Sequence, residues 1–355
     1  MTPMTSKERF NRILQHKDAD RVPIWDFPWP GTLARWRQEG LPENVDFVDY
    51  FGFDKVARIT VDNSPQYEAH TLEETREHRV YSTSWGAVQK DFKNQDSTPQ
   101  FLEYSITTPD KWREAKQRMK PSPERIPWDY LKANYKKWRT EGYWVDAKLN
   151  FGFQTVEAFL LGAERMLIAL LEDPEWCVEM FNHYLDVDIA LYEQVWDAGY
   201  HFDAITWTDD LGYKNGMFFS PTIYRELLKP VQKRAVDWAH RKGAMVRCHS
   251  CGNINTVVPD LVDLGIDLLH PLEVKVGMDP LNIKRVHGDR LAIHGGLNAM
   301  LWKDLNAITA EIERLVPALM ESGGYVFAAD HSIPNDVSFE NMKAIVELAK
   351  KIGTY

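Results

Sequence analysis

The 355-residue chain has few cysteines, no long apolar run and no block of basic residues. Three cysteines, Cys177, Cys248 and Cys251, are too few and too unevenly spaced for a disulfide framework, so a reducing compartment fits and metal binding stays open. No apolar stretch approaches the roughly twenty residues of a membrane-spanning helix, and the first residues lack the hydrophobic stretch of a signal peptide. We therefore expect a soluble, cytoplasmic protein with no membrane partner.

The charge of the chain argues against nucleic-acid binding. The sequence has 42 Lys and Arg against 52 Asp and Glu, a formal net charge of -10. Binding to phosphate backbones needs a concentrated basic face, whereas patches such as residues 132–139 are typical of a solvated helix. We expect no nucleic-acid partner. The 44% hydrophobic content is enough for a large core, and the 13 tryptophans supply either that core or a pocket for an aromatic ligand.

One cassette recurs six times: a glycine that ends a helix, a short apolar strand, then polar residues. The segments are 142–150, 199–210, 243–249, 265–270, 288–294 and 324–331. Each glycine stands where a helix end favours a left-handed residue. Helices are expected between these strands, one from Ser220-Pro221 to Gly243 and others at 254–264, 306–321 and 338–352. Such units require parallel strands joined by right-handed crossovers.

The repeat predicts a (β/α)₈ barrel, or TIM barrel, that occupies residues 1–355 as a single domain. Two further strands are expected at 21–25 and 55–60, after a short N-terminal extension. Residues 74–104 are expected to form an inserted antiparallel β-hairpin. No low-complexity linker separates the parts.

In such a barrel the active site forms at the carboxyl ends of the strands, where residues distant in sequence converge. Four of the 11 histidines fall at these ends. The full set of polar strand-end residues is Asn150, Asp209, Asp210, His249, Cys251, His270, Glu273, His294, Asp330 and His331. This enrichment in imidazole, with a thiol beside it, favours a metal site.

His249 and Cys251 are two residues apart just past a strand, so both side chains can turn toward one point. A catalytic zinc ion takes such a pair plus one or two ligands from other strands, with a position left open for substrate. We predict zinc at His249 and Cys251 with His331 as the third ligand, and Asp330 or Glu273 as alternatives. Glu273 is also a candidate for the fourth position until substrate displaces it. The alternative for the pair itself is a capping histidine beside a buried cysteine, and Cys248 is expected in the core.

The remaining strand-end residues receive roles in catalysis and substrate binding. Asp209 or Asp210 is expected to orient the substrate, and only one of these neighbours can point inward. His270 or His294 is expected to donate a proton as general acid. Substrate contacts are expected from Trp25, Trp29, Asn150 and Trp207.

Four stretches resemble the uroporphyrinogen decarboxylase superfamily, whose members are single (β/α)₈ barrels. They are 6–23, 209–230, Cys248-His-Ser-Cys-Gly-Asn253 and Ser338-Phe-Glu-Asn341. The His-x-Cys motif is similar to that of the zinc-dependent methyltransferases that work with a corrinoid protein. Those enzymes take a third ligand from a cysteine nine residues before a Glu-Asn pair, and His331 stands at that position here. The resemblance thus implies zinc and a cobalamin carried by a partner corrinoid protein.

Two departures from the family pattern keep alternatives open. The metal-free decarboxylases also have a histidine in the region of His331, but their arginine-rich N-terminal motif is replaced here by Trp25-Asp-Phe-Pro-Trp-Pro30. A zinc ion with two imidazoles and one thiolate keeps a positive charge and polarises an ether or hydroxyl oxygen. We therefore predict O-demethylation of a small, methoxylated, aromatic compound. The alternatives are a metal-free decarboxylase and a non-catalytic ligand-binding barrel, and a homodimer stays open.

Overall fold

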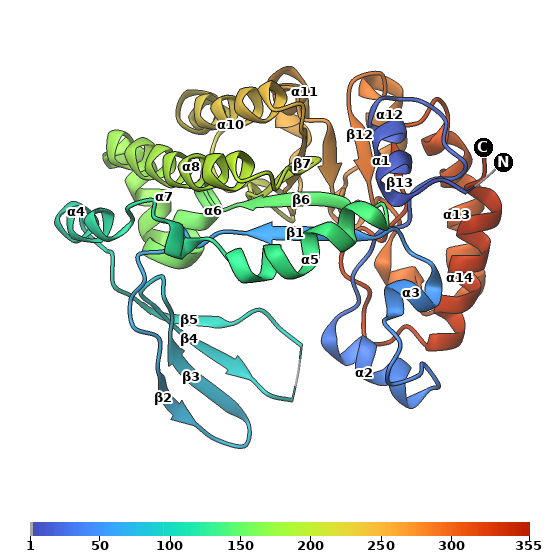
Figure 1. Cartoon of the computed structure of the whole chain (residues 1–355), viewed down its shortest axis with the longest axis horizontal. Helices are drawn as coiled ribbons and strands as arrows, with labels where there is room; N and C mark the ends of the chain where they lie inside the picture. The colour runs from blue at the N-terminus through green and yellow to red at the C-terminus, as the bar shows by residue number, and fades with distance from the viewer. Residues whose placement is uncertain (1–2, 95) are drawn as a thin grey trace.

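The computed structural model, which describes residues 3–94 and 96–355, has a curled, seven-stranded parallel sheet at its centre (Figure 1). The strand order is β1-β6-β7-β10-β11-β12-β13, and all neighbours are parallel. The strands are β1 (Val56–Thr60), β6 (Trp144–Leu149), β7 (Ala204–Thr208), β10 (Met245–His249), β11 (Leu268–His270), β12 (Ala292–His294) and β13 (Tyr325–Val326). The six sequence cassettes supply β6 to β13 of this sheet, so the parallel βα repeat is confirmed.

The segment expected as a strand at 21–25 is not a regular strand. Ile24 forms a single parallel bridge with Phe327, just past β13, and Pro28 forms another with Ile333. Trp25 N donates to Phe327 O at 3.2 Å. Pro23 and Pro28 have no N–H to donate, so a continuous ladder cannot form here. The segment lies beside β13 as an irregular, extended stretch.

Helices follow the strands and cover the outer face of the sheet, with α8, α10 and α11 on one side and α13 and α14 on another (Figure 1). The longer ones are α1 (Ser6–Leu14), α2 (Pro30–Gln38), α4 (Pro109–Arg118), α5 (Trp128–Thr140), α7 (Ala163–Glu172), α8 (Pro174–Asp197), α10 (Lys229–Arg241), α11 (Val258–Leu264), α12 (Pro280–His287), α13 (Leu305–Met320) and α14 (Phe339–Ile352). Short pieces are α3 (Phe47–Phe51), α6 (Phe153–Val156), α9 (Pro221–Ile223), the π-helices η2 (Glu157–Leu161) and η3 (Tyr224–Leu228), and the 3₁₀ turns η1 (Pro123–Arg125), η4 (Asn255–Val257), η5 (Val274–Val276) and η6 (Ala299–Leu301).

The helix expected after Ser220 begins there but is divided. The Ser220 hydroxyl accepts a hydrogen bond from Ile223 N, as expected for a cap. The π-helix η3 then interrupts the helix before α10. A second π-helix, η2, lies between β6 and β7, and η3 lies between β7 and β10, so each is in a connection that follows a strand whose end contributes to the candidate site. Single π turns often occur near functional sites.

Buried side chains form two clusters. The larger lies between the sheet and the helices. The smaller joins α1 to one end of the sheet, and its members are Phe10, Ile13, Leu14, Ala19, Trp25, Trp144, Ala204, Leu268, Ala292 and Val326. Because these strand residues precede the polar ones along each strand, α1 covers the amino ends of the strands. The carboxyl ends are left for the candidate site.

An antiparallel sheet is inserted between β1 and β6 and projects away from the parallel sheet (Figure 1). Its strands, in order, are β2 (Thr71–Glu74), β3 (His78–Ser82), β4 (Ala87–Phe92) and β5 (Gln100–Tyr104). The sequence predicted only a hairpin over 74–104. All four residues of β2 are exposed, so this strand has no apolar alternation to reveal it. Residue 95 lies outside the described residues. A two-stranded ribbon, β8 (Gly212–Tyr213) and β9 (Gly216–Met217), follows β7.

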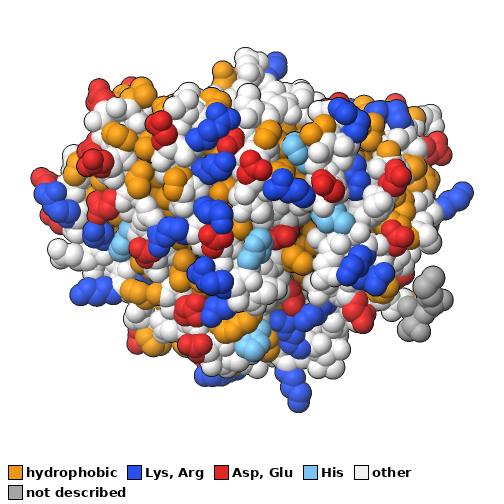
Figure 2. Space-filling view, turned by 90° about the horizontal axis from the view of Figure 1, so that it is seen from above, with side chains coloured by type: hydrophobic (Ala, Val, Ile, Leu, Met, Phe, Trp, Pro, Cys, Tyr) orange, Lys and Arg blue, Asp and Glu red, His pale blue; other side chains and the backbone are white. Residues whose placement is uncertain are grey.

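The surface carries charges of both signs. Figure 2 shows Lys and Arg interspersed with Asp and Glu across one face of the molecule. This face therefore has no extended surface of a single charge. Within 3–94 and 96–355, no helix combines the length and apolar character needed to span a bilayer.

Candidate functional site

The ends of β7, β10 and β11 bring the expected site residues together. His249, the last residue of β10, pairs in register with Thr208 on β7 and with His270 on β11. Cys251 follows His249 by two residues, and Asp210 follows Thr208 by two. Parallel strands place their carboxyl ends at one edge of the sheet, so these side chains meet there.

Two overlapping groups of potential metal ligands share Cys251. In the first group, one ligand atom each from Asp210, His249 and Cys251 lies within 4.8 Å of the others. In the second group, Cys251, Glu273 and His331 meet the same condition. Cys251 Sγ lies 3.3 Å from His249 Nε2, which in turn lies 3.5 Å from Asp210 Oδ1. Asp210, expected to orient substrate, therefore lies among the donors, and Cys251 stands between His249 and His331.

His249 presents one nitrogen to this group and uses the other to contact His270. The two Nδ1 atoms lie 2.6 Å apart, which leaves Nε2 of His249 directed at Cys251 and Asp210. Burial lowers the pKa of His249 well below its ordinary value, and the positive charges of Arg247 and Lys148 lower it further. The ring is therefore neutral near pH 7 and has a lone pair for a metal ion. A histidine ligand held through its second nitrogen is the usual arrangement at metal sites.

The charges around Cys251 fit a divalent cation. Burial raises the pKa of the Cys251 thiol, and the carboxylates of Asp210 and Glu273 raise it further. Burial also raises the pKa of Asp210. Lys275 Nζ lies 3.0 Å from Glu273 Oε1. A bound cation would stabilise the thiolate and both carboxylates, and a thiolate with imidazole and carboxylate donors is a set that zinc accepts.

Two glycines allow the loops after β7 and β10 to approach closely enough to place Cys251. Gly252 has a φ of +81°, and a Cβ built on it would lie 2.1 Å from the carbonyl carbon of Gly212. The loops are joined by hydrogen bonds from Cys251 N to Asp210 Oδ1 at 2.9 Å and from Asn253 N to Tyr213 O at 3.0 Å. Gly252 N donates to Glu273 Oε2 at 2.6 Å. The donor groups are thus fixed by backbone contacts.

The region after β13 places His331 and Asp330 differently. The His331 ring lies parallel to that of Trp29, with centroids 6.2 Å apart. Asp330 is fully buried and accepts hydrogen bonds from Ala299 N at 2.8 Å and Val274 N at 3.1 Å. It belongs to neither donor group of the described chain. Asp330 therefore fixes the loops around Glu273, which leaves His331 and Glu273 as the nearer alternatives for the third ligand.

The expectation that His294 serves as a general acid is corrected by its surroundings. The side chain is fully buried. Its Nε2 donates to Trp25 O at 2.7 Å, and its Nδ1 accepts from Arg247 Nε at 3.3 Å. Because both nitrogens are engaged, His294 has no proton to offer a substrate. Its ring lies 4.4 Å from that of His270, so it supports the contact between His270 and His249.

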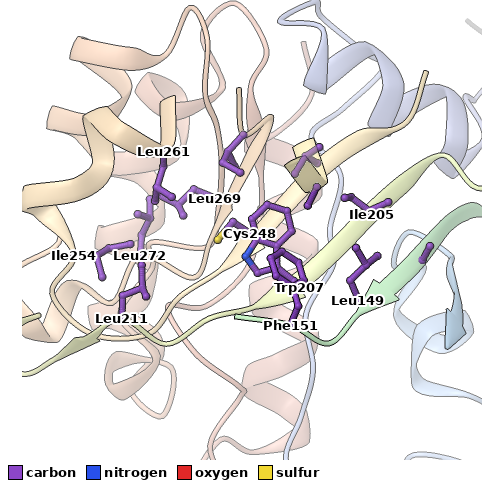
Figure 3. Packing of buried hydrophobic residues seen from close by; sticks show 14 of the residues in the cluster. Leu149, Phe151, Ile205, Trp207, Leu211, Cys248, Ile254, Leu261, Leu269 and Leu272 are labelled. Carbon is purple, nitrogen blue, oxygen red and sulfur yellow. The ribbon is translucent and has the colours of Figure 1, made fainter. Parts of the chain in front are cut away.

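Two tryptophans expected to bind substrate lie in the core instead. Trp25 is 4% exposed and packs edge-on against Phe10 and Trp144, with ring centroids 5.7 and 5.9 Å away. Trp207 is fully buried and lies with Phe151 and Cys248 on the helix-facing side of the sheet (Figure 3). Side chains alternate along a strand, so Trp207 points opposite to its neighbours Thr206 and Thr208. The expectation that Cys248 is a core residue is confirmed.

Asp209 is turned away from the donor groups. Its Oδ1 accepts from Gln154 N at 2.9 Å and its Oδ2 from Gln232 Nε2 at 3.0 Å. Burial raises the pKa of Asp209 to about 7. A Cβ on Gly152 would lie 2.5 Å from Asp209 Oδ2, so glycine allows the loop after β6 to reach this carboxyl group. Of the adjacent pair, Asp210 faces the donors and Asp209 holds the neighbouring loop.

Asn150, at the end of β6, keeps its place near an open cavity. Its N donates to Asp188 Oδ2 at 2.7 Å, and its carbonyl accepts from Asn63 Nδ2 at 2.8 Å. With Thr60 at the end of β1, it lines a cavity of about 400 Å³. Asn150 therefore borders space at the carboxyl ends of the strands.

Three charged residues on the inner face of the sheet were missed by the sequence analysis: Arg58 on β1, Lys148 on β6 and Arg247 on β10. Arg247 precedes His249 by two residues and thus shares its face. A signal was present, because Asp146, Lys148 and Arg247 interrupt otherwise apolar strands at alternate positions. Burial lowers the pKa of Arg247 to about 9.

Comparisons with known proteins give a family and a fold. The profile of the family described as uroporphyrinogen decarboxylase (URO-D) matches residues 154–352, more than half of the chain. The methylcobamide:CoM methyltransferase MtaA of Methanosarcina barkeri is 27% identical over 190 residues, which cover 51% of this chain and 52% of that protein. A uroporphyrinogen decarboxylase of Helicobacter pylori is 24% identical over 211 residues, 59% of this chain and 56% of that protein.

The chain spans about half the length of these curated relatives in the matched regions. A solved structure covers more of it. A methyltransferase from Methanosarcina mazei superposes with a TM-score of 0.67 over 98% of this chain and 99% of that one, at 17% identity. At this identity the likeness supports the fold alone.

Proposed function

Because the chain belongs to the uroporphyrinogen decarboxylase family, we propose that it is a zinc-dependent methyltransferase that moves a methyl group between a small methylated substrate and a corrinoid protein. The observation that carries this proposal is the clustering of thiol, imidazole and carboxylate donors around Cys251. The match to a methylcobamide:CoM methyltransferase supports the same branch. A metal-free decarboxylase would have no need of such a donor set.

His249 and Cys251 are the proposed central ligands, with His331 as the third and Glu273 and Asp210 near enough to complete the site. Zinc bound there would act as a Lewis acid on an oxygen of the substrate. The proposed direction is O-demethylation of a small compound. The methyl group leaves without its bonding electrons and passes to the reduced corrinoid of the partner, and the substrate oxygen keeps the electron pair until it takes up a proton.

The chain's own residues hold this arrangement in place. When His249 ligates through Nε2, its Nδ1 carries a proton and donates to His270 Nδ1. His270 is therefore proposed as a positioning residue rather than the general acid. The Trp29 ring stacks on the ring of His331. The Asp210 carboxylate accepts a hydrogen bond from the backbone N–H of Cys251 and so fixes the position of that residue.

Further proposals concern the whole chain. We propose that residues 1–355 form one (β/α)₈ domain in which residues 23–25, beside β13, take the eighth strand position. The antiparallel sheet β2–β5 is its insertion. Residues 1, 2 and 95 lie outside the described residues. A cytoplasmic location and a homodimer stay as predictions from the sequence.

The proposal is tested by metal content together with methyl transfer. The purified protein should contain about one zinc per chain. With cob(I)alamin as acceptor it should demethylate members of a panel of aryl methyl ethers, and His249→Ala with Cys251→Ala should abolish both properties. A wild-type protein without metal that decarboxylates a substrate would assign the chain to the decarboxylases. Full zinc occupancy in the double variant would place the metal elsewhere.

A further inference from the structure

Three positively charged side chains lie on the inner face of the sheet, at strand positions that precede those of the candidate metal ligands. Lys148 on β6 and Arg247 on β10 both pair in register with Thr206 on the strand between them. Arg58 on β1 pairs with Asp146 on β6. Paired residues of parallel strands point to the same face. The three cations therefore share the face on which His249 lies, two residues or about 7 Å further along β10 than Arg247.

Two of these three cations form no ion pair with the described residues. Asp146 is fully buried and accepts from Arg58 Nη2 at 2.9 Å and from Thr206 Oγ1 at 2.7 Å. The other neighbouring carboxyl group, Asp188 on α8, is also fully buried, and burial raises its pKa well above its ordinary value. Among the described residues, Arg58 is thus the one of the three cations that has an ion-pair partner.

Unlike Arg58, Lys148 has no acidic partner among the described residues. Its Nζ donates to Thr208 Oγ1 at 2.6 Å, and no carboxylate of the described residues lies within 4.0 Å. Burial and the charge of Arg58 lower its pKa to about 8. By contrast, buried Arg9 in the core contacts both Asp20 and Asp54. A half-buried ammonium without a counter-ion is stabilised by an anion that arrives with a ligand.

The position of this ammonium suits an incoming ligand. Thr208, its partner, pairs with His249, so Nζ lies at the level of the candidate metal ligands. Thr60, which pairs with Lys148, is exposed. The Arg58 side chain is 41% exposed and can be reached as well. Arg247 is only 4% exposed, so it contributes positive potential and no direct contact.

We propose that Lys148, assisted by Arg58, binds a carboxylate group of the substrate beside the metal site. This inference rests on the proposed methyltransferase function and deepens it, because it assigns the substrate class as small methylated carboxylic acids. A ligand held by its carboxylate at Lys148 extends across the inner face and presents its other end to the donors around Cys251.

The test compares two ligands that differ mainly in charge, 4-methoxybenzoate and 4-methoxybenzamide, by isothermal titration calorimetry at pH 7. The protein of residues 1–355 is titrated as purified and again after chelation and dialysis, so the result does not depend on zinc or on methyl transfer. The variants are Lys148→Met, the conservative Lys148→Arg, and Lys132→Met as a control at an exposed lysine of α5. Circular dichroism establishes that each variant is folded.

The wild-type protein should bind the benzoate at least about tenfold more tightly than the amide, since a charge-assisted hydrogen bond is lost with the amide. Lys148→Met should abolish this preference, whereas Lys148→Arg and Lys132→Met should retain it. Equal affinity of the wild-type protein for both ligands, no binding of the benzoate, or an unchanged preference in Lys148→Met would overturn the proposal. Loss of zinc or of methyl transfer with the preference intact would instead count against the proposed function alone.

Discussion

The substitution Gly252→Ala tests whether the close contact of two loops builds the donor groups. Gly252 has a φ of +81°, where an L-residue is destabilised by about 1–2 kcal/mol. Its new Cβ would also lie 2.1 Å from the carbonyl carbon of Gly212, which is rigid backbone. Relief of that overlap requires the loops after β7 and β10 to separate. Overpacking of this kind adds roughly 1–3 kcal/mol.

Gly199→Ala is a matched control. Gly199 has a φ of +89°, but a Cβ there would have nothing within 4 Å. Gly199→Ala should therefore lower the free energy of unfolding only by the conformational contribution of about 1–2 kcal/mol. Gly252→Ala should lose about twice that in urea unfolding, and the shift of Cys251 should weaken zinc binding in a competition titration with a chromophoric chelator. Gly199→Ala should bind zinc like the wild type. Equal stability losses in both variants, with zinc affinity unchanged in Gly252→Ala, would show that this loop contact does not position Cys251.

Three further predictions use the same two assays. His270→Gln should lower zinc affinity about 10–100-fold, because the ring of His249 loses its contact with His270. The control His70→Gln, at an exposed position, should leave zinc affinity unchanged. Equal zinc affinities in the two variants would remove His270 from its positioning role. Trp207→Ala should destabilise the fold by about 3–5 kcal/mol with zinc content intact, and Trp29→Ala by much less; the reverse order would contradict the placement of Trp207 in the core. Gln232→Leu leaves buried groups of Asp209 and Tyr224 without partners and should lower the free energy of unfolding by about 1–3 kcal/mol; an unchanged urea midpoint would show that this network does not stabilise the protein.

The parallel repeat was predictable because its signals are local. A glycine after each helix and a short apolar run mark β6 to β13 in the sequence, and the polar residues that follow are the ones that meet at the strand ends. The placement of His249 and Asp210 at strand ends could therefore be predicted from the sequence. The irregular shape of the segment around Ile24 was not predicted, because residues 21–25 are mostly apolar although Pro23 cannot donate to a ladder.

The face of the sheet to which a side chain points was harder to predict. Trp207 is expected from the sequence to contact substrate, yet strand alternation points it toward the helices (Figure 3). Asp210 was assigned to substrate because its approach to His249 depends on the contact between Gly212 and Gly252, which has no local signal. Lys148 and Arg247 lie within strands, whereas the sequence analysis draws its candidates from the strand ends.

The proposed zinc ion is held by one thiolate and by imidazole or carboxylate donors at Cys251. X-ray absorption at the zinc edge of the purified protein measures this directly. The spectrum should show one sulfur at about 2.3 Å and two or three nitrogen or oxygen ligands at about 2.0–2.2 Å. The sulfur contribution should disappear in Cys251→Ser. A protein without zinc, or a zinc spectrum with no sulfur in the wild type, would contradict the claim.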